Sequence, residues 1–373
     1  MNGPQPAEIG MPLEEVETPA LLLDLDALER NLSRLATQVQ SMGIRLRPHA
    51  KTHKSAIIAR RQMALGAVGV CCQKVSEAEA MVQGGVSDVL ISNEIVGPRK
   101  LARLAALARD ARLAVCVDNA DSLSALSAAA ERFRATIDVL VEVNVGANRC
   151  GVDPGAPVLA LAKQVARAPR LRFRGLQGYQ GAAQHIRDFT ERRAAVAAAI
   201  VKVQETAALL ARHGLECEDI AGAGTGTYAF EGRSGVYTEL QAGSYIFMDA
   251  DYARNLGEDG RPASEFEHSL FVYATVMSKP GAERAVLDAG FKALSFDSGP
   301  PTFADRRDAT YFKGSDEHGT VRVISGNQQL AIGDKVRLIP GHCDPTVNLY
   351  DWYVGYRNGH VEALWPVARG PGY

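Results

Sequence analysis

The fold is decided by two short apolar runs, Ala67-Val68-Gly69-Val70-Cys71-Cys72 and Asp88-Val89-Leu90-Ile91-Ser92, which enclose a stretch of helical length at 76–84. Short apolar runs of this kind are typical of strands that are buried on both faces. A helix between two such strands predicts that they pair in parallel, because a parallel pair needs a crossover connection. Cys71 and Cys72 are then expected to lie in a buried strand as reduced thiols.

The same unit recurs along the chain. Strand-like runs lie at 44–50, 67–72, 88–92, 113–118, 137–143, 173–179, 217–222 and 237–242. Stretches of helical length, rich in alanine, leucine, arginine and glutamate, lie at 76–84, 98–110, 121–134, 156–168 and 190–213. Strands that alternate with helices in this way predict an α/β fold, a closed (β/α)₈ TIM barrel. The alternative is an open doubly wound sheet, but its GxGxxG fingerprint is missing after the first strand.

The two ends of the chain differ from this repeating pattern. The run Leu21 to Asp26 predicts a strand that enters an Asp-capped helix at about 27–42. After Gly257, glycine and proline are frequent, and short alternating runs predict an all-β domain. These runs lie at 270–276, 284–288, 319–324 and 335–339. We therefore expect a barrel domain at 24–257 and a C-terminal β domain at 258–373, which the N-terminal strand at 12–23 joins.

Composition favours a small-molecule partner. Hydrophobic residues make up 46% and charged residues 23% of the chain, and the formal net charge is −2, so no strong charge points to nucleic acid or to an anionic membrane. No apolar stretch is expected to reach the roughly 18 residues that span a bilayer, and Met1 to Met11 do not read as a signal sequence. The six cysteines lack the spacing of a disulfide framework. We expect a cytoplasmic protein.

A basic octapeptide at 47–54 follows the run Ile44-Arg45-Leu46-Arg47. The alternation of that run predicts a half-buried strand with the apolar side chains on one face and the arginines on the other. The strand then delivers Lys51 to its carboxyl end. Basic neighbours should disfavour the charged form of Lys51, as an amine nucleophile that forms a Schiff base requires. The alternative is a solvated basic loop.

Further polar side chains follow the expected strands at the end where (β/α)₈ barrels build their active sites. They are Gln73, Asn93, Asp118, Asn144, Arg149, Tyr179, Thr225 and Tyr245. Gly222-Ala223-Gly224-Thr225-Gly226 follows the seventh strand, where glycines and a hydroxyl could form a phosphate cradle or only a tight turn. Arg149 could donate a hydrogen bond to a cofactor ring nitrogen without losing its own proton, or be a surface charge.

In the expected β domain, Gly341-His342-Cys343-Asp344-Pro345-Thr346 is the sharpest signal. In an extended segment His342 and Asp344 would project to the same side and could hold one divalent cation, while Cys343 would point away. A purely structural role for the pair is the alternative. His185, which follows the sixth strand, is a candidate acid or base, and His318 is a weaker one.

The assembled residues resemble the fold-type III, alanine-racemase-like pyridoxal-phosphate enzymes, and within them the D-threonine aldolase and 3-hydroxy-D-aspartate aldolase group. The resemblance covers nearly the whole chain. It runs through Arg47-Pro48-His49-Ala50-Lys51, 69–78, Asn148-Arg149-Cys150-Gly151-Val152, Gly224-Thr225-Gly226, 239–245 and 342–346.

The resemblance implies roles for particular residues. Lys51 would carry the pyridoxal phosphate, Arg149 would contact its pyridine nitrogen, and Gln73, Tyr179, Tyr245, Gly224, Thr225 and Gly226 would complete the cofactor site. His342 and Asp344 would hold a divalent metal such as manganese or magnesium. Related dehydratases have cysteine at the position of Asp344, so the aspartate favours an aldolase. Some threonine aldolases have Tyr-His where this chain has Tyr179-Gln180.

The expected activity is therefore a metal-activated, pyridoxal-phosphate-dependent retro-aldol cleavage of D-3-hydroxy-α-amino acids to glycine and an aldehyde or glyoxylate. His185 is the candidate base for the 3-hydroxyl. The alternatives are a dehydratase of D-serine or D-3-hydroxyaspartate, a racemase, and a non-catalytic pyridoxal-phosphate carrier. A homodimer is expected from the resemblance.

Overall fold

The computed structural model describes residues 4–324 and 330–368. Contacts divide the chain into two compact units, which are described separately. The barrel unit contains Leu35–Gly243 and Asn255–Arg261, and the β unit contains the chain up to Arg34, Ser244–Arg254 and Pro262–Ala368. Compared with the boundaries expected from the sequence, this division assigns the first part of the helix after residue 24, and 244–254, to the β unit. The expected end of the β domain at 373 lies outside the described residues.

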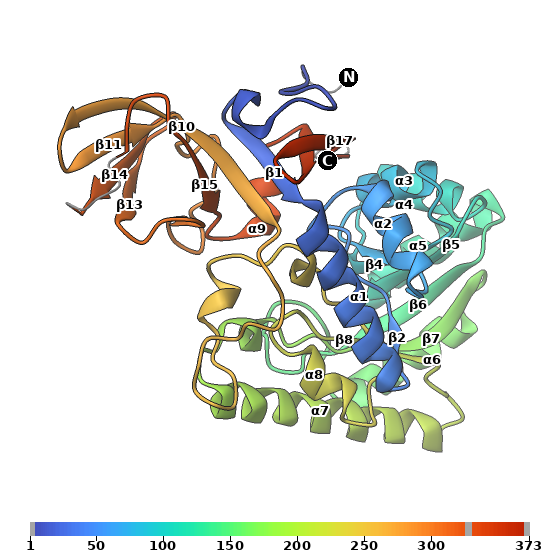
Figure 1. The fold of residues 1–373 in the computed structure, drawn as a ribbon. Helices are drawn as coiled ribbons and strands as arrows, with labels where there is room; N and C mark the ends of the chain where they lie inside the picture. Colours follow the sequence, from blue (N-terminus) through green and yellow to red (C-terminus); the bar gives the residue numbers. More distant parts are fainter. Residues whose placement is uncertain (1–3, 325–329, 369–373) are drawn as a thin grey trace. The chain divides into compact units, whose positions relative to one another are not determined.

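Eight parallel strands form the sheet of the barrel unit in the described part of the chain (Figure 1). They are β2 (Arg45–Leu46), β3 (Val70–Cys72), β4 (Asp88–Glu94), β5 (Arg112–Val117), β6 (Ile137–Glu142), β7 (Leu171–Gln177), β8 (Asp219–Gly222) and β9 (Glu239–Leu240). Their order is β2-β9-β8-β7-β6-β5-β4-β3. The ring closes where Ala50 N donates to Cys71 O (2.8 Å) and Cys71 N donates to Pro48 O (2.9 Å). The predicted (β/α)₈ barrel is confirmed.

Helices follow the strands at nearly all the predicted places. They are α1 (Leu25–Ser41), α2 (Ala56–Ala64), α3 (Val75–Gln83), α4 (Pro98–Leu107), α5 (Ala120–Phe133), α6 (Ala156–Arg167), α7 (Phe189–Arg212) and α8 (Tyr228–Gly232). Sequence analysis missed the five-residue α8. It also missed α2, whose N-cap Ser55 accepts a hydrogen bond from Ile58 N. This helix is only nine residues long and directly follows the basic octapeptide, so its periodicity was too short to stand out.

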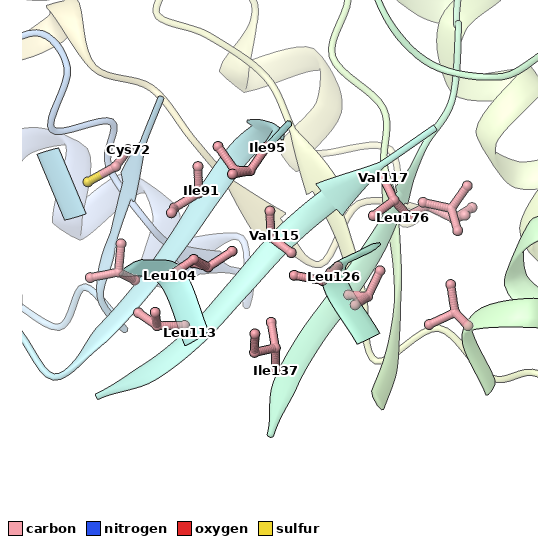
Figure 2. Packing of buried hydrophobic residues seen from close by; sticks show 14 of the residues in the cluster. Cys72, Ile91, Ile95, Leu104, Leu113, Val115, Val117, Leu126, Ile137 and Leu176 are labelled. Carbon is pink, nitrogen blue, oxygen red and sulfur yellow. The ribbon is translucent and has the colours of Figure 1, made fainter. Parts of the chain in front are cut away.

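Side chains of the barrel strands alternate between two cores. Those that face outward pack against the helices, and Figure 2 shows Ile91, Val115 and Ile137 on neighbouring strands near Leu104 of α4 and Leu126 of α5. The intervening side chains form a second, smaller cluster, made of Cys71, Leu90, Cys116, Leu140 and Ala221. Because alternate residues of a strand face opposite sides of the sheet, Cys71 and Cys72 belong to different cores. Both are buried free thiols, as predicted.

Charged side chains fill the amino-terminal end of the barrel. Arg47 is only 6% exposed, and it donates to Glu239 Oε1 (2.8 Å) and to Asp88 Oδ1 (2.6 Å). Arg174 makes the equivalent contact with Asp219 Oδ2 (2.8 Å). The interpretation of the octapeptide as a solvated loop is therefore wrong, because most of its residues are buried. The arginine is tolerated there because two carboxylates compensate its charge.

The β unit is built on a mixed nine-stranded sheet in the described residues. Its strands are β1 (Ala20–Asp24), β10 (Leu270–Gly281), β11 (Arg284–Leu287), β12 (Thr302–Phe303), β13 (Ala309–Gly314), β14 (Gly319–Val323), β15 (Lys335–Ile339), β16 (Trp352–Arg357) and β17 (His360–Pro366). Strand β1 pairs antiparallel with β10 and parallel with β16. The N-terminal strand, expected within 12–23 and found at Ala20–Asp24, therefore lies in the same sheet as β10 and β16. The five-residue helix α9 (Cys343–Val347) lies between β15 and β16.

Helix α7 differs from one expectation. Among the described residues it is the one helix that is long and apolar enough to cross a membrane. In its most apolar 18-residue window, 28% is buried inside the protein. Its many alanines give positive hydropathy to the exposed side as well as the buried one. Its buried side includes Ala199, Val203 and Leu210, which belong to the barrel core. A core helix of a soluble protein passes the same test, so this finding is weak evidence for a membrane span.

Candidate active site

The candidate Schiff-base lysine lies in the turn after β2. Lys51 is half-buried, and its backbone N donates to Nδ1 of the buried His49 (3.4 Å). The other ring nitrogen, Nε2, lies 2.9 Å from Gln73 Nε2 and 3.2 Å from Ser92 Oγ. Gln73 Nε2 also donates to Ser92 Oγ (3.4 Å). The carboxyl ends of β2, β3 and β4 are thus joined around Lys51.

The glycine-rich loop follows β8, as predicted, but its glycines serve a different contact. Gly226 N donates to Gln184 Oε1 (2.9 Å), and Gly224 N donates to Thr227 Oγ1 (3.4 Å). Thr225 Oγ1 is buried and has no hydrogen-bond partner among the described residues. A buried hydroxyl without a partner is costly, so the loop fits a ligand that accepts a hydrogen bond, such as a phosphate group.

Arg149 and Tyr179, which were expected separately at the cofactor, lie close together. Arg149 is exposed, and its Cζ lies 5.5 Å from the centre of the half-buried Tyr179 ring. This is the geometry of a cation–π contact. The two side chains come from the loops after β6 and β7, so the contact forms at the carboxyl end of the barrel strands, where the cofactor ring nitrogen was expected.

Two carboxyl groups near Arg149 were missed by sequence analysis. Oxygens of Glu94 and Glu142 and the Cys150 sulfur all lie within 4.8 Å of one another. Burial and the nearby charge of Glu94 raise the pKa of Glu142 to about 8, although Arg149 partly opposes the shift. Glu142 is therefore largely neutral at pH 7. The signal available in the sequence was that each glutamate ends a buried strand.

His185 ends a short 3₁₀ helix at Gly181–His185. Its side chain is exposed, whereas the neighbouring Gln184 is fully buried. The two neighbouring residues therefore differ in environment. The His185 imidazole is reached by solvent, and the Gln184 amide is enclosed beside the glycine-rich loop.

The metal motif of the β unit folds differently from the expectation. His342 has extended backbone and caps α9, but Cys343 and Asp344 form the first turn of that helix. The expectation of an extended segment was wrong at these two positions, because Pro345 suits the first turn of a helix. Cys343 does not simply point away either, since its buried Sγ contacts Asp344 Oδ1 at 3.4 Å.

The contacts of the motif still fit a cation. His342 Nδ1 lies 2.6 Å from Asp297 Oδ2, and Asp344 Oδ1 accepts a hydrogen bond from Ser244 Oγ (3.2 Å). A metal-binding histidine usually donates its second ring N–H to a carboxylate in this way. Burial lowers the pKa of His342, but Asp344, Asp297 and Asp249 outweigh it and raise the pKa overall. One ring nitrogen and one carboxylate suit manganese, magnesium or zinc.

Two further residues of the β unit, Asp297 and Tyr245, differ from what the sequence led us to expect. Asp297 was not predicted, because it lies 45 residues before His342 and in no recognisable motif. Tyr245, expected at the cofactor, is buried in the β unit and packs edge-on against Phe266 with ring centres 5.6 Å apart.

Comparison with known proteins places the chain among enzymes. The model for the alanine racemase N-terminal domain matches residues 23–251, and that for a putative serine dehydratase domain matches 269–356. The chain is 50% identical to 3-hydroxy-D-aspartate aldolase of Paracoccus denitrificans over 99% of this chain and 96% of that protein. It is 51% identical to D-threonine aldolase of an Arthrobacter species, over 98% and 96%.

The crystal structure of D-threonine aldolase from Filomicrobium marinum superposes with a TM-score of 0.95 at 53% identity, covering 98% of this chain and 99% of that one. These matches extend over both units of the chain. The chain therefore belongs to the alanine-racemase-like, fold-type III family of pyridoxal-phosphate enzymes, in the group that includes D-threonine aldolase and 3-hydroxy-D-aspartate aldolase.

Proposed function

We propose that this protein is a metal-activated, pyridoxal-phosphate-dependent lyase that cleaves D-3-hydroxy-α-amino acids to glycine and an aldehyde, or glyoxylate when the substrate is 3-hydroxyaspartate. The observation that carries the metal dependence is the pair His342 and Asp344, in which the histidine already engages Asp297 through Nδ1. Such a pair is suited to activate a hydroxyl group, which an aldol cleavage requires and a simple racemisation does not.

Pyridoxal phosphate would be held by Lys51, by Arg149 at its ring nitrogen, and by the Gly224-Thr225-Gly226 loop at its phosphate, with Gln73 and Tyr179 beside the ring. When bound, it supplies an electron-withdrawing group for the bonds at Cα of an amino acid. Arg149 would donate a hydrogen bond to the ring nitrogen and keep its own proton. The ring nitrogen would then stay unprotonated, and its withdrawal of electrons would be weaker.

A weaker electron sink places more demand on the groups at the 3-hydroxyl. His342 and Asp344 would hold a manganese or magnesium ion, which supplies Lewis acidity toward that oxygen. His185 is the candidate to accept the hydroxyl proton, because its imidazole is exposed and histidine is the side chain that most often acts as a general base. Lys51 would give up its bond to the cofactor to the substrate amine, and its Nζ would then be a free amine beside the substrate.

The experiment is to identify products, with and without metal. The purified protein is incubated with D-threonine and with D-threo-3-hydroxyaspartate in the presence of manganese, then after chelation and after metal is restored. Glycine with acetaldehyde or glyoxylate, lost on chelation and regained with metal, supports the proposal. A keto acid with ammonia would instead identify a dehydratase, and pyridoxal phosphate binding without turnover would identify a carrier.

We also propose that the enzyme is a homodimer and that it works in the cytoplasm. The six cysteines are free thiols, which suits a reducing compartment. Burial raises the pKa of Cys71, Cys72 and Cys116, so these thiols are unreactive and structural. Light scattering of the purified holoenzyme tests the dimer.

A further inference from the structure

We propose that Gln184 is the positioning residue that fixes the Gly224-Thr225-Gly226 loop in the shape that accepts the cofactor phosphate. This inference rests on the proposed function, because it takes pyridoxal phosphate as the ligand of the loop. The glycines themselves do not explain the shape, since their backbone N–H groups point to protein atoms.

Gln184 makes contacts on both sides of its amide. Its Oε1 accepts from Gly226 N (2.9 Å), and its Nε2 donates to Thr227 Oγ1 (2.8 Å) and to Gln180 O (3.4 Å). The side chain has no solvent exposure, so water cannot replace these bonds if the amide is removed. The amide thus holds the C-terminal end of the loop directly, and it reaches Gly224 through Thr227 Oγ1, which also accepts from Gly224 N (3.4 Å).

Gln184 leaves no room for a side chain at the two loop glycines. A Cβ on Gly224 would lie 2.4 Å from Gln184 Oε1, and a Cβ on Gly226 would lie 2.7 Å from the Gln184 carbonyl oxygen. Neither glycine has a positive φ, whereas Ala223 before them has φ of +70°. Left-handed backbone is disfavoured for a residue with a Cβ, and it persists where surrounding contacts enforce it. The glycines therefore leave space for Gln184. We infer that the hydrogen bonds of Gln184 keep the loop in this conformation, in which Ala223 has a disfavoured backbone angle.

A second layer supports the same loop. Thr227 Oγ1 accepts from Gln184 and donates to Glu231 Oε1 (2.9 Å). Glu231 is only 1% exposed, and burial raises its pKa to about 8. A neutral carboxyl group beneath the loop does not repel an incoming phosphate. These contacts occupy Gly226 N and Thr227 Oγ1, and they leave Thr225 Oγ1 as the buried donor without a partner in the described chain.

The test compares two ligands that differ only in the phosphate. Apoprotein is titrated with pyridoxal phosphate and with pyridoxal, and binding is followed by visible absorbance. In Gln184→Ala the affinity for pyridoxal phosphate should fall by about tenfold or more, as expected when a buried hydrogen-bonded group loses its partner. The affinity for pyridoxal should stay within about twofold, since that ligand does not use the loop.

Two variants complete the design. Gln62→Ala removes another buried glutamine, in α2, and should change neither affinity. Thr227→Val removes the acceptor of the Gln184 amide and should reproduce the selective loss, so the inference stays testable if Gln184→Ala does not fold. Unchanged binding of pyridoxal phosphate, or an equal loss for both ligands in folded protein, would overturn the inference. Wild-type protein that binds neither ligand would overturn the proposed function itself.

Discussion

The buried carboxyl group of Glu142 should make the stability of the barrel unit depend on pH. Its pKa is raised from 4.5 to about 8, first because burial disfavours its charged form and then because Glu94 carries a like charge beside it. In the unfolded chain the same group releases its proton near its ordinary pKa. Between these two values the folded state binds one proton that the unfolded state does not.

The sign and size of the effect follow from this difference in bound protons. Because the folded state binds more protons, the free energy of unfolding falls as pH rises through the window from about 4.5 to about 8. A fully shifted group contributes a slope of about 1.4 kcal/mol per pH unit, so the total reaches about 3 to 5 kcal/mol at its upper limit. Glu142→Gln removes the titrating group while it keeps the shape of the neutral side chain.

The assay is urea unfolding of apoprotein, followed by circular dichroism at several pH values between about 5 and 8. We expect Glu142→Gln to gain stability relative to wild type as pH rises through this window. Glu205→Gln, on the exposed side of α7, controls for the loss of one carboxyl group and should follow wild type. Parallel curves for Glu142→Gln and wild type would refute the reasoning, because they would show that the buried group binds no extra proton.

Three further results are expected. Asp297→Ala should weaken manganese binding by about 10- to 100-fold, because the histidine that would bind the metal loses the carboxylate behind it. Binding is measured from free manganese by electron paramagnetic resonance. Asp305→Ala, which removes another exposed aspartate of the β unit, should leave manganese binding unchanged. Lys51→Ala should abolish the yellow colour of the holoenzyme, and a spectrum identical to wild type would remove Lys51 from the cofactor site. Arg47→Met should lower the free energy of unfolding by about 3 to 5 kcal/mol, because the buried Glu239 loses the arginine that donates to it. An unchanged midpoint in urea would argue against that ion-pair contribution.

The fold was largely predictable because its signals are local. Each barrel strand is a short apolar run, and each long helix has its own period, so the order of elements could be written from the sequence. Helix α2 was missed because nine residues give too little periodicity. The position of Lys51, Arg149 and Thr225 at strand ends followed from the order of elements together with a rule about parallel barrels.

The parts that were not predicted depend on contacts between distant residues. Whether Arg47 faces water or a carboxylate depends on Glu239, which lies 192 residues away, and no local pattern joins them. Asp297 and Gln184 make hydrogen bonds of the same long-range kind. The prediction of an extended backbone at the His342 motif failed for a different reason. Over three residues, spacing alone does not distinguish a helix from an extended segment.

The paired arginines and carboxylates at the amino-terminal end of the barrel, of which Arg47 with Glu239 is one, have a consequence for how new activities could arise. Charge compensation is concentrated at one end of the strands, and the side chains that would contact the cofactor follow the other end. Substitutions in the loops at the carboxyl ends can therefore be sampled without disturbing these ion pairs. For directed evolution toward other aldehydes, a library confined to those loops should contain a larger share of folded variants than one spread along whole strands.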